Sequence, residues 1–133
     1  MNDVIEYDKK QDDKYYYTET SCKFYHQLKE SMTNKNTAYQ WRRVYVRENK
    51  SQLVPTLTAN MGTGGHNVPL ILTNDNHIRK LTPKECFYIQ GFPKSYQLPK
   101  QSNTRLYKQA GNSVVVPVIY RIAKEIKNAI EEC

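Results

Sequence analysis

Apolar residues near the end of the chain recur with a helical period. Between Val115 and Ile130 they are spaced three and four residues apart, which is typical of an amphipathic helix. The pattern predicts a helix from about Pro117 to Ile130 that exposes Arg121, Lys124, Lys127 and Asn128. The run VVVPV before it is entirely apolar and follows a Gly-Asn-Ser sequence, which we interpret as a turn. A stretch this apolar needs a buried partner surface.

The segment LTPKECFYIQGFP carries the clearest local helix signal. Thr82 is a candidate N-cap, Pro83 stands at the first helical position and Glu85 at the third, which together form a capping box. A glycine followed two residues later by a proline ends the pattern. We therefore expect a short helix over residues 83–90.

Period-two alternation predicts strands in the middle of the chain. In WRRVYVR (41–47), Arg42, Val44 and Val46 would lie on one face of a strand, and Trp41, Arg43, Tyr45 and Arg47 on the other. The segments VPTLTA and NVPLILT predict two further strands, joined through the glycine-rich loop NMGTGGH. The first 36 residues are polar, with a possible helix around CKFYHQLKESM, and are typical of a connecting arm.

Length and composition bound this picture. A chain of 133 residues holds at most one domain with a modest core. Its hydrophobic content is only 38%, but 11 tyrosines argue against disorder. Short strands and separate helices together indicate an α+β fold.

Charge is distributed unevenly along the sequence. The formal net charge is +7, although the first 20 residues hold six acidic residues and only three basic ones. The rest of the chain is therefore strongly basic, which favours a polyanionic partner such as nucleic acid. Ordinary solubility would also account for such a balance.

The cysteines and the hydropathy profile exclude several classes of protein. Cys22, Cys86 and Cys133 are odd in number and lack the spacing of a zinc site or a disulfide framework. No apolar stretch approaches the ~18 residues that a membrane span requires. We expect a soluble protein in a reducing, intracellular setting without a membrane partner or a bound metal.

Two features are candidates for chemistry with nucleic acid. The predicted strand face interleaves arginines with aromatic rings, and the glycine-rich loop lets backbone N–H groups approach phosphates or base edges. A solvated strand face and an ordinary hairpin loop remain the alternative. His26, His66 and His77 are isolated and are expected to be ordinary surface residues, whereas Cys86 is expected to be a buried structural thiol. No self-contained catalytic set stands out.

Three blocks resemble a known family in order and spacing. RKLTPKECFYIQGFPKSY and YKQAGNSVVVPVIYRIAKEI resemble the last two sequence motifs of the cytosine-C5 DNA methyltransferases. VPTLTANMGTGGHNVPLIL before them resembles the target-recognition region of that family, and DVIEYDKKQDDKYYYTE resembles the connector that precedes it. The resemblance implies a connecting arm at 1–36, a target-recognition region at 37–110, and a motif turn and helix at 111–133 that complete the catalytic domain.

The resemblance also shows what this sequence lacks. The family uses a glycine-rich loop for S-adenosylmethionine, a Pro-Cys pair for the nucleophile and a Glu-Asn-Val segment for the acid, and none of the three occurs here. Cytosine methylation needs that thiolate to attack C6. The chain is therefore expected to carry no catalytic residue and to be inactive by itself, sharing S-adenosylmethionine with a catalytic part.

Site residues follow from the resemblance, position by position. Arg43 resembles the arginine that reads a guanine edge, and Thr56 resembles the threonine that holds the phosphate beside the flipped cytosine. Asn112 and Ser113 match the turn that touches the cofactor. The expected contacts to double-stranded DNA come from Arg42, Arg43, Arg47, Thr56, Thr58, Asn60, Gly62, Gly64 and Gly65. Arg79, Thr82, Glu85, Gln90 and Gly91 are expected to form scaffold.

Two questions stay open at the level of sequence. The expected function is target recognition and cofactor-pocket completion in a bacterial, cytoplasmic restriction-modification methyltransferase, either as a subunit or as a C-terminal fragment. The alternative is a non-catalytic, sequence-specific DNA-binding module. The apolar stripe of the last helix either faces a missing catalytic domain or packs on the chain's own small sheet.

Overall fold

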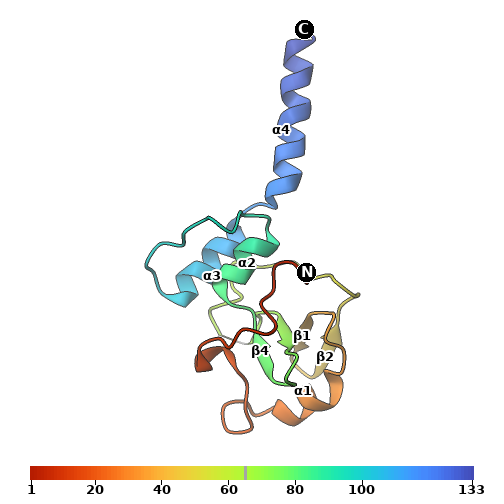
Figure 1. Ribbon diagram of the computed structural model, residues 1–133, viewed down its shortest axis with the longest axis vertical. Coiled ribbons are helices and arrows are strands. Elements are labelled where there is room, and N and C mark those ends of the chain that lie inside the picture. Colours follow the sequence, from red (N-terminus) through yellow and green to blue (C-terminus); the bar gives the residue numbers. More distant parts are fainter. Residues whose placement is uncertain (65) are drawn as a thin grey trace.

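The computed structural model describes residues 1–64 and 66–133, so the predicted DNA contact at Gly65 lies outside the described residues. A small sheet and two helices form a body from which the last helix extends (Figure 1). The elements in chain order are η1 (Asp13–Tyr15), α1 (Tyr25–Ser31), β1 (Tyr39–Arg42), β2 (Tyr45–Glu48), β3 (Leu70–Leu72), β4 (Ile78–Lys80), α2 (Pro83–Ile89), α3 (Asn103–Asn112) and α4 (Val116–Glu131).

The sheet is antiparallel throughout, with strand order β2-β1-β3-β4. β3 lies within the predicted strand NVPLILT, and its three residues are all buried. β4 was not predicted; it pairs with β3 along its whole length. Strands and helices are thus separate in sequence, which confirms the α+β prediction.

The segment WRRVYVR is a hairpin, and its prediction as one strand was wrong. β1 and β2 pair antiparallel around a two-residue turn formed by Arg43 and Val44, with Arg42 opposite Tyr45. Arg43 has a φ of 55°, a left-handed conformation that only a minority of non-glycine residues adopt. The turn reverses the parity of the alternation, because even-numbered residues of β1 face odd-numbered residues of β2. Arg42 therefore shares a face with Arg47, opposite to the face of Trp41.

No strand forms at VPTLTA within the described residues, which is a second correction. The segment nevertheless alternates in burial: Leu57 is buried, whereas Thr56 and Thr58 are exposed. Leu57 belongs to the larger of two hydrophobic clusters and anchors the segment without ladder hydrogen bonds. The alternation read from the sequence reflects this anchoring.

The first 36 residues contribute to both hydrophobic clusters. Ile5 and Tyr15 are buried against α2 and α3 in the larger cluster. The smaller cluster gathers Cys22, Leu28 and Met32 against β1, β3 and β4. The arm is therefore part of the core as well as a connection, and its polar composition conceals a few well-spaced apolar anchors.

A buried ion pair fastens α2 to the sheet and to the arm. The Arg79 guanidinium donates two hydrogen bonds of 2.7 and 2.8 Å to the Glu85 carboxylate, and these side chains are 0% and 2% exposed. Glu85 also accepts from the backbone N–H groups of Glu6 and Thr82, and the Thr82 hydroxyl accepts from the Glu85 N–H. The capping box is thus present, and the predicted helix over 83–90 is confirmed at Pro83–Ile89.

Helix α3 was missed by the sequence analysis. The Ser102 hydroxyl caps it by accepting from the Arg105 N–H, and it ends at Asn112. Gly111 therefore lies in the last helical turn and not in a free Gly-Asn-Ser turn. A methyl group at this position would overlap the backbone carbonyl of Thr58, so only glycine permits this approach of α3 to the 56–59 segment.

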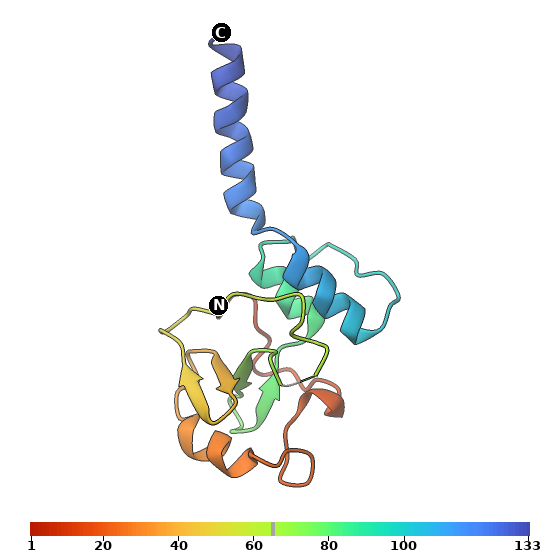
Figure 2. The same ribbon diagram turned by 180° about the vertical axis from the view of Figure 1, so that it is seen from behind.

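Helix α4 confirms the predicted amphipathic helix and leaves it uncovered. None of its 16 residues is buried, and both views show it projecting from the body (Figures 1 and 2). Its base is fixed by a hydrogen bond of 2.7 Å from the Val116 N–H to the Gln90 carbonyl. The alternative in which its stripe packs on the chain's own sheet is therefore wrong. Among the described residues, no helix is long and apolar enough to cross a membrane.

Candidate nucleic-acid interface

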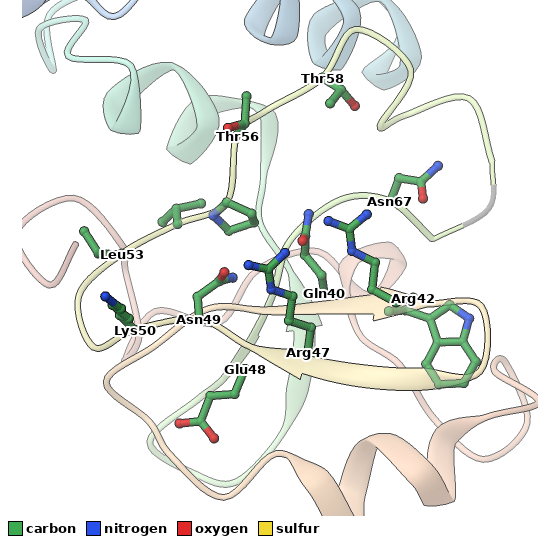
Figure 3. Close-up of a pocket in the computed structure, with 13 residues that line it drawn as sticks. Gln40, Arg42, Arg47, Glu48, Asn49, Lys50, Leu53, Thr56, Thr58 and Asn67 are labelled. Atoms are coloured by element: carbon green, nitrogen blue, oxygen red, sulfur yellow. The ribbon is translucent and has the colours of Figure 1, made fainter.

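The largest basic hollow lies between the β1–β2 hairpin and the segment that follows it. We call it the hairpin cleft; its volume is about 710 Å³. Figure 3 shows its lining, which includes Gln40, Arg42, Arg47, Lys50, Thr56 and Thr58. Its lining is mainly polar, with three cations and one acidic residue, Glu48. Such a surface is suited to an anionic ligand.

The hairpin register determines which side chains enter the cleft. Gln40 pairs with Arg47 across the strands, and Arg42 follows Gln40 on the same face. The side chains of these three residues point into the cleft side by side (Figure 3). Neither arginine makes an ion pair with another described residue. Two of the predicted DNA contacts are thus brought together, and Gln40, which the sequence analysis missed, lies between them.

Thr56 and Thr58 reach the cleft from its other wall. Leu57, buried between them in the larger cluster, holds both hydroxyl groups outward. Behind Thr58 lies the close contact with Gly111 of α3. The wall is therefore rigidly backed by the helix that leads to the predicted cofactor residues.

Arg43 occupies a different hollow from Arg42's partner Arg47. At the tip of the hairpin, a second pocket of about 830 Å³ is lined by Trp41, Arg42, Arg43, His66 and Asn67. Arg43 is exposed and holds its left-handed conformation there. Backbone conformations of this kind persist where the surrounding structure enforces them, and they cluster at functional sites.

An aromatic cluster joins the hairpin to the glycine-rich loop. The rings of Phe24 and Trp41 are stacked with centroids 4.0 Å apart, and His66 packs edge-on against Phe24 at 4.8 Å. The Tyr17 hydroxyl lies 3.1 Å from His66 Nδ1. Burial lowers the pKa of His66, with a smaller effect of Lys80, so the neutral ring accepts this hydrogen bond. His66 is thus more than an ordinary surface residue, because it links two loops.

The glycine-rich loop contains glycines of two kinds. A methyl group at Gly62 would lie 2.7 Å from Tyr107 Cβ, so this glycine allows close packing on α3. Gly64 has a φ of 108° and open space around it. Asn60 accepts hydrogen bonds from the Thr63 N–H and hydroxyl, which closes a tight turn. Of these residues, Asn60 and Gly64 are the ones positioned to meet a ligand.

Asn112 and Ser113 lie apart from the hairpin cleft, at the end of α3. The Ser113 hydroxyl donates to the Ala110 carbonyl at 2.8 Å, which leaves its oxygen lone pairs free. The Asn112 side chain is exposed and makes no hydrogen bond to another described residue. Both donor and acceptor groups are thus presented at this helix end. Cys86, by contrast, is fully buried, and burial raises the pKa of its thiol, as expected of a structural cysteine.

Comparison with known proteins identifies one family. The C-5 cytosine-specific DNA methylase family matches residues 1–128. Type II methyltransferase M.Bsp6I from Bacillus sp. (strain RFL6) is 63% identical over 126 residues, which are 95% of this chain and 40% of the relative. Type II methyltransferase M.DsaV from Dactylococcopsis salina is 30% identical over 131 residues, or 98% of this chain and 35% of the relative.

A shorter match falls on part of the chain. Type II methyltransferase M.MspI from Moraxella sp. is 52% identical over 54 residues, which are 41% of this chain and 13% of the relative. The chain thus spans about two fifths of the length of its Bacillus relative and a smaller share of the other two. No solved structure matches it.

Proposed function

Because the chain belongs to the C-5 cytosine-specific DNA methylase family, we propose that it recognises the DNA target and completes the cofactor pocket of a DNA (cytosine-5-)-methyltransferase. The observation that carries the proposal is the hairpin cleft, in which Arg42 and Arg47 converge opposite Thr56 and Thr58. In this proposal residues 1–36 form the arm, 37–110 the recognition region, and 111–133 the part that joins the catalytic domain.

Electrostatics favour double-stranded DNA as the ligand of the cleft. The chain carries a formal net charge of +7, and the cationic side chains of the cleft are exposed. Guanidinium groups donate two parallel hydrogen bonds to the O6 and N7 atoms of guanine, and the same groups bind phosphates. The paired arginines suit base edges, and the hydroxyls of Thr56 and Thr58 suit the phosphates beside a flipped cytosine. Arg43, Asn60 and Gly64 extend this surface at the hairpin tip and loop.

Methyl transfer requires groups beyond this stretch of sequence. A thiolate must attack cytosine C6, and the buried Cys86 is unsuited to that step because its thiol is held protonated. Cys22 is also buried, and burial raises the pKa of its thiol. We therefore propose that the chain is inactive until it is joined to a part that carries the nucleophile.

The end of α3 fits a role beside S-adenosylmethionine. The exposed Asn112 amide offers a donor and an acceptor, and Ser113 retains acceptor capacity, which suits the polar groups of that cofactor. When bound, the cofactor supplies the methyl group. Asn112 and Ser113 would orient it at the boundary between the two parts of the enzyme.

Helix α4 is proposed to pack on the catalytic part. Its exposed stripe includes Val118, Ile119, Ile122, Ile126 and Ile130. Burying four such side chains contributes roughly 6–12 kcal/mol before entropy is subtracted. That is enough to hold two bodies together, whether they belong to one polypeptide or to two.

The proposal is tested in the complete methyltransferase with Arg47→Ala. Methyl transfer from S-adenosylmethionine to DNA, and the set of methylated sequences, are measured for the wild type, for this variant and for Arg43→Ala. We expect each variant to weaken discrimination at one base pair by about 1–3 kcal/mol. If neither variant changes DNA affinity or sequence choice, the hairpin does not read DNA.

The cofactor assignment has its own test. Asn112→Ala and Ser113→Ala are expected to reduce methyl transfer more than DNA binding. Unchanged turnover would refute the assignment. If the chain binds specific DNA but no combination with a catalytic polypeptide transfers methyl groups, the non-catalytic DNA-binding module is the better description.

A further inference from the structure

The side chain of Gln40 is the least explained polar group of the hairpin cleft. Its Oε1 atom is buried without a hydrogen-bond partner among the described residues. Its amide nitrogen, in contrast, points into the cleft (Figure 3). An unpaired buried polar atom costs stability, and such an arrangement in a folded protein calls for an explanation. The explanation offered below is that the amide is held ready for a ligand.

The neighbours of Gln40 restrict what that ligand is. Arg47 lies directly opposite on β2, and Arg42 lies two residues further along β1 on the same face. Both guanidinium groups are donors only, and the amide nitrogen of Gln40 is also a donor. The floor of the cleft therefore offers three adjacent donors without an intervening acceptor. A ligand that fits this row presents closely spaced acceptors.

Two parts of DNA present such acceptors, namely the phosphate backbone and the major-groove edge of guanine. Gln40 is half-buried, whereas both arginines are exposed, so its amide lies deeper in the cleft than their stems. A neutral, recessed amide gains little from a phosphate, which is bound through charge at the rim. The N7 and O6 atoms of guanine, recessed in the major groove, accept from such a group.

We propose that Gln40 is a specificity-determining residue, whose amide N–H donates to the major-groove edge of a guanine between the contacts of Arg42 and Arg47. This inference rests on the proposed function of the cleft. It goes beyond that function by assigning one base to one side chain. The buried Oε1 atom fixes the orientation of the amide because the oxygen is turned away from the ligand.

The test uses the complete methyltransferase and DNA that contains every short sequence. Methylated cytosines are mapped by bisulfite sequencing for the wild type and for Gln40→Ala. We expect Gln40→Ala to lose about tenfold or more in discrimination at one G·C pair of the recognised sequence, with the other positions unchanged. Gln40→Glu replaces the donor by an acceptor, so it should prefer C·G at the same position, because a carboxylate accepts from cytosine N4.

Controls separate recognition from folding. Gln101→Ala removes the same side chain from an exposed position outside the cleft and should leave the methylated sequences unchanged. Thermal unfolding of each variant checks that the hairpin is intact. A conservative variant, Gln40→Asn, keeps the amide on a shorter stem and should restore part of the discrimination lost in Gln40→Ala.

Several outcomes would overturn the assignment. A uniform loss of methylation on all sequences would make Gln40 a backbone contact or a structural residue, and an unchanged pattern would remove it from recognition. Relaxation at an A·T pair would replace guanine by adenine. Failure of the proposed function is distinguishable, because Arg47→Ala would then also leave the methylated sequences unchanged.

Discussion

Helices α2 and α4 present opposite outcomes of equally regular sequence patterns. α2 has seven residues, and five of them are buried against the sheet, the arm and α3. α4 has 16 residues and buries none, although its apolar stripe is longer and more periodic. The comparison teaches that periodicity specifies a helix and its apolar face, but not the surface that covers this face.

The two helices also differ in how their ends are held. α2 begins with a complete capping box and ends with Gly91 in a left-handed conformation, where the Gly91 and Phe92 N–H groups return to Tyr88 and Phe87. α4 begins at Val116 without a side-chain cap. An isolated helix of this length is marginal in water. The body is therefore stabilised by its own contacts, whereas α4 depends on contacts with another surface.

The largest expected effect comes from breaking the buried ion pair of the body. Glu85→Ala leaves Arg79 buried and unpaired, which should lower the free energy of unfolding by about 3–5 kcal/mol. Denaturant unfolding measures this. The matched control is Glu131→Ala, which removes the exposed pair with Lys127 in α4 and should change stability by less than about 0.5 kcal/mol. Equal effects at both sites would abolish the contrast between the two regions.

The next effect concerns the contact between α3 and the cleft wall. Gly111→Ala forces the Thr58 backbone to move, and overpacking of this kind typically costs about 1–3 kcal/mol. DNA affinity of the complete enzyme should fall as well, because Thr56 and Thr58 share the displaced segment. Asn112→Ala, at the adjacent exposed position, is the stability control. A variant with wild-type stability and affinity would show that the segment adjusts freely.

A smaller effect is expected at the N-cap of α2. Thr82→Ala removes the hydroxyl that accepts from the Glu85 N–H and should reduce the free energy of unfolding by about 1 kcal/mol. Thr104→Ala removes an exposed threonine from the first turn of α3, away from its cap, and serves as the comparison. If the two substitutions are equivalent by urea unfolding, the capping box contributes nothing to the rigidity of α2.

The smallest effect on stability belongs to the stripe of α4. Replacing Ile122 and Ile126 together by aspartate should change the unfolding of the body by no more than about 0.5 kcal/mol, because neither side chain is buried. The same double variant should abolish methyl transfer by the complete enzyme if the stripe faces the catalytic part. Aspartates at Arg121 and Lys124, on the polar face, should spare activity. A strongly destabilised body would mean that the stripe packs internally.

The sequence predicted the elements whose signals are local. The capping box of α2 depends on residues three positions apart, and the helical period of α4 is visible over 16 residues. Strand β3 was predicted because Leu70, Ile71 and Leu72 form an apolar run. The family was also identified from the sequence, because its motifs occur as continuous blocks.

What the sequence did not predict depends on contacts between distant residues. α3 was missed because only Leu106, Tyr107 and Ala110 of its ten residues are buried, and its packing relies on Gly62 and Gly111. The hairpin was predicted as one strand because Arg43 is an unusual residue for a left-handed turn. Gln40 was missed for the same reason, since only the strand register places it beside Arg47. The roles of the candidate site residues stay predictions.

The tight reversal at Arg43 and Val44 makes the hairpin a two-position switch for sequence preference. Adding one residue to that loop while β2 keeps its pairing would shift the register by one, so that every side chain of one strand exchanges the ligand side for the opposite side. Trp41 or Val46 would then replace a polar group in the cleft. Gain or loss of a single codon at this tip is therefore a short evolutionary route to a new DNA target, and it leaves the rest of the body untouched.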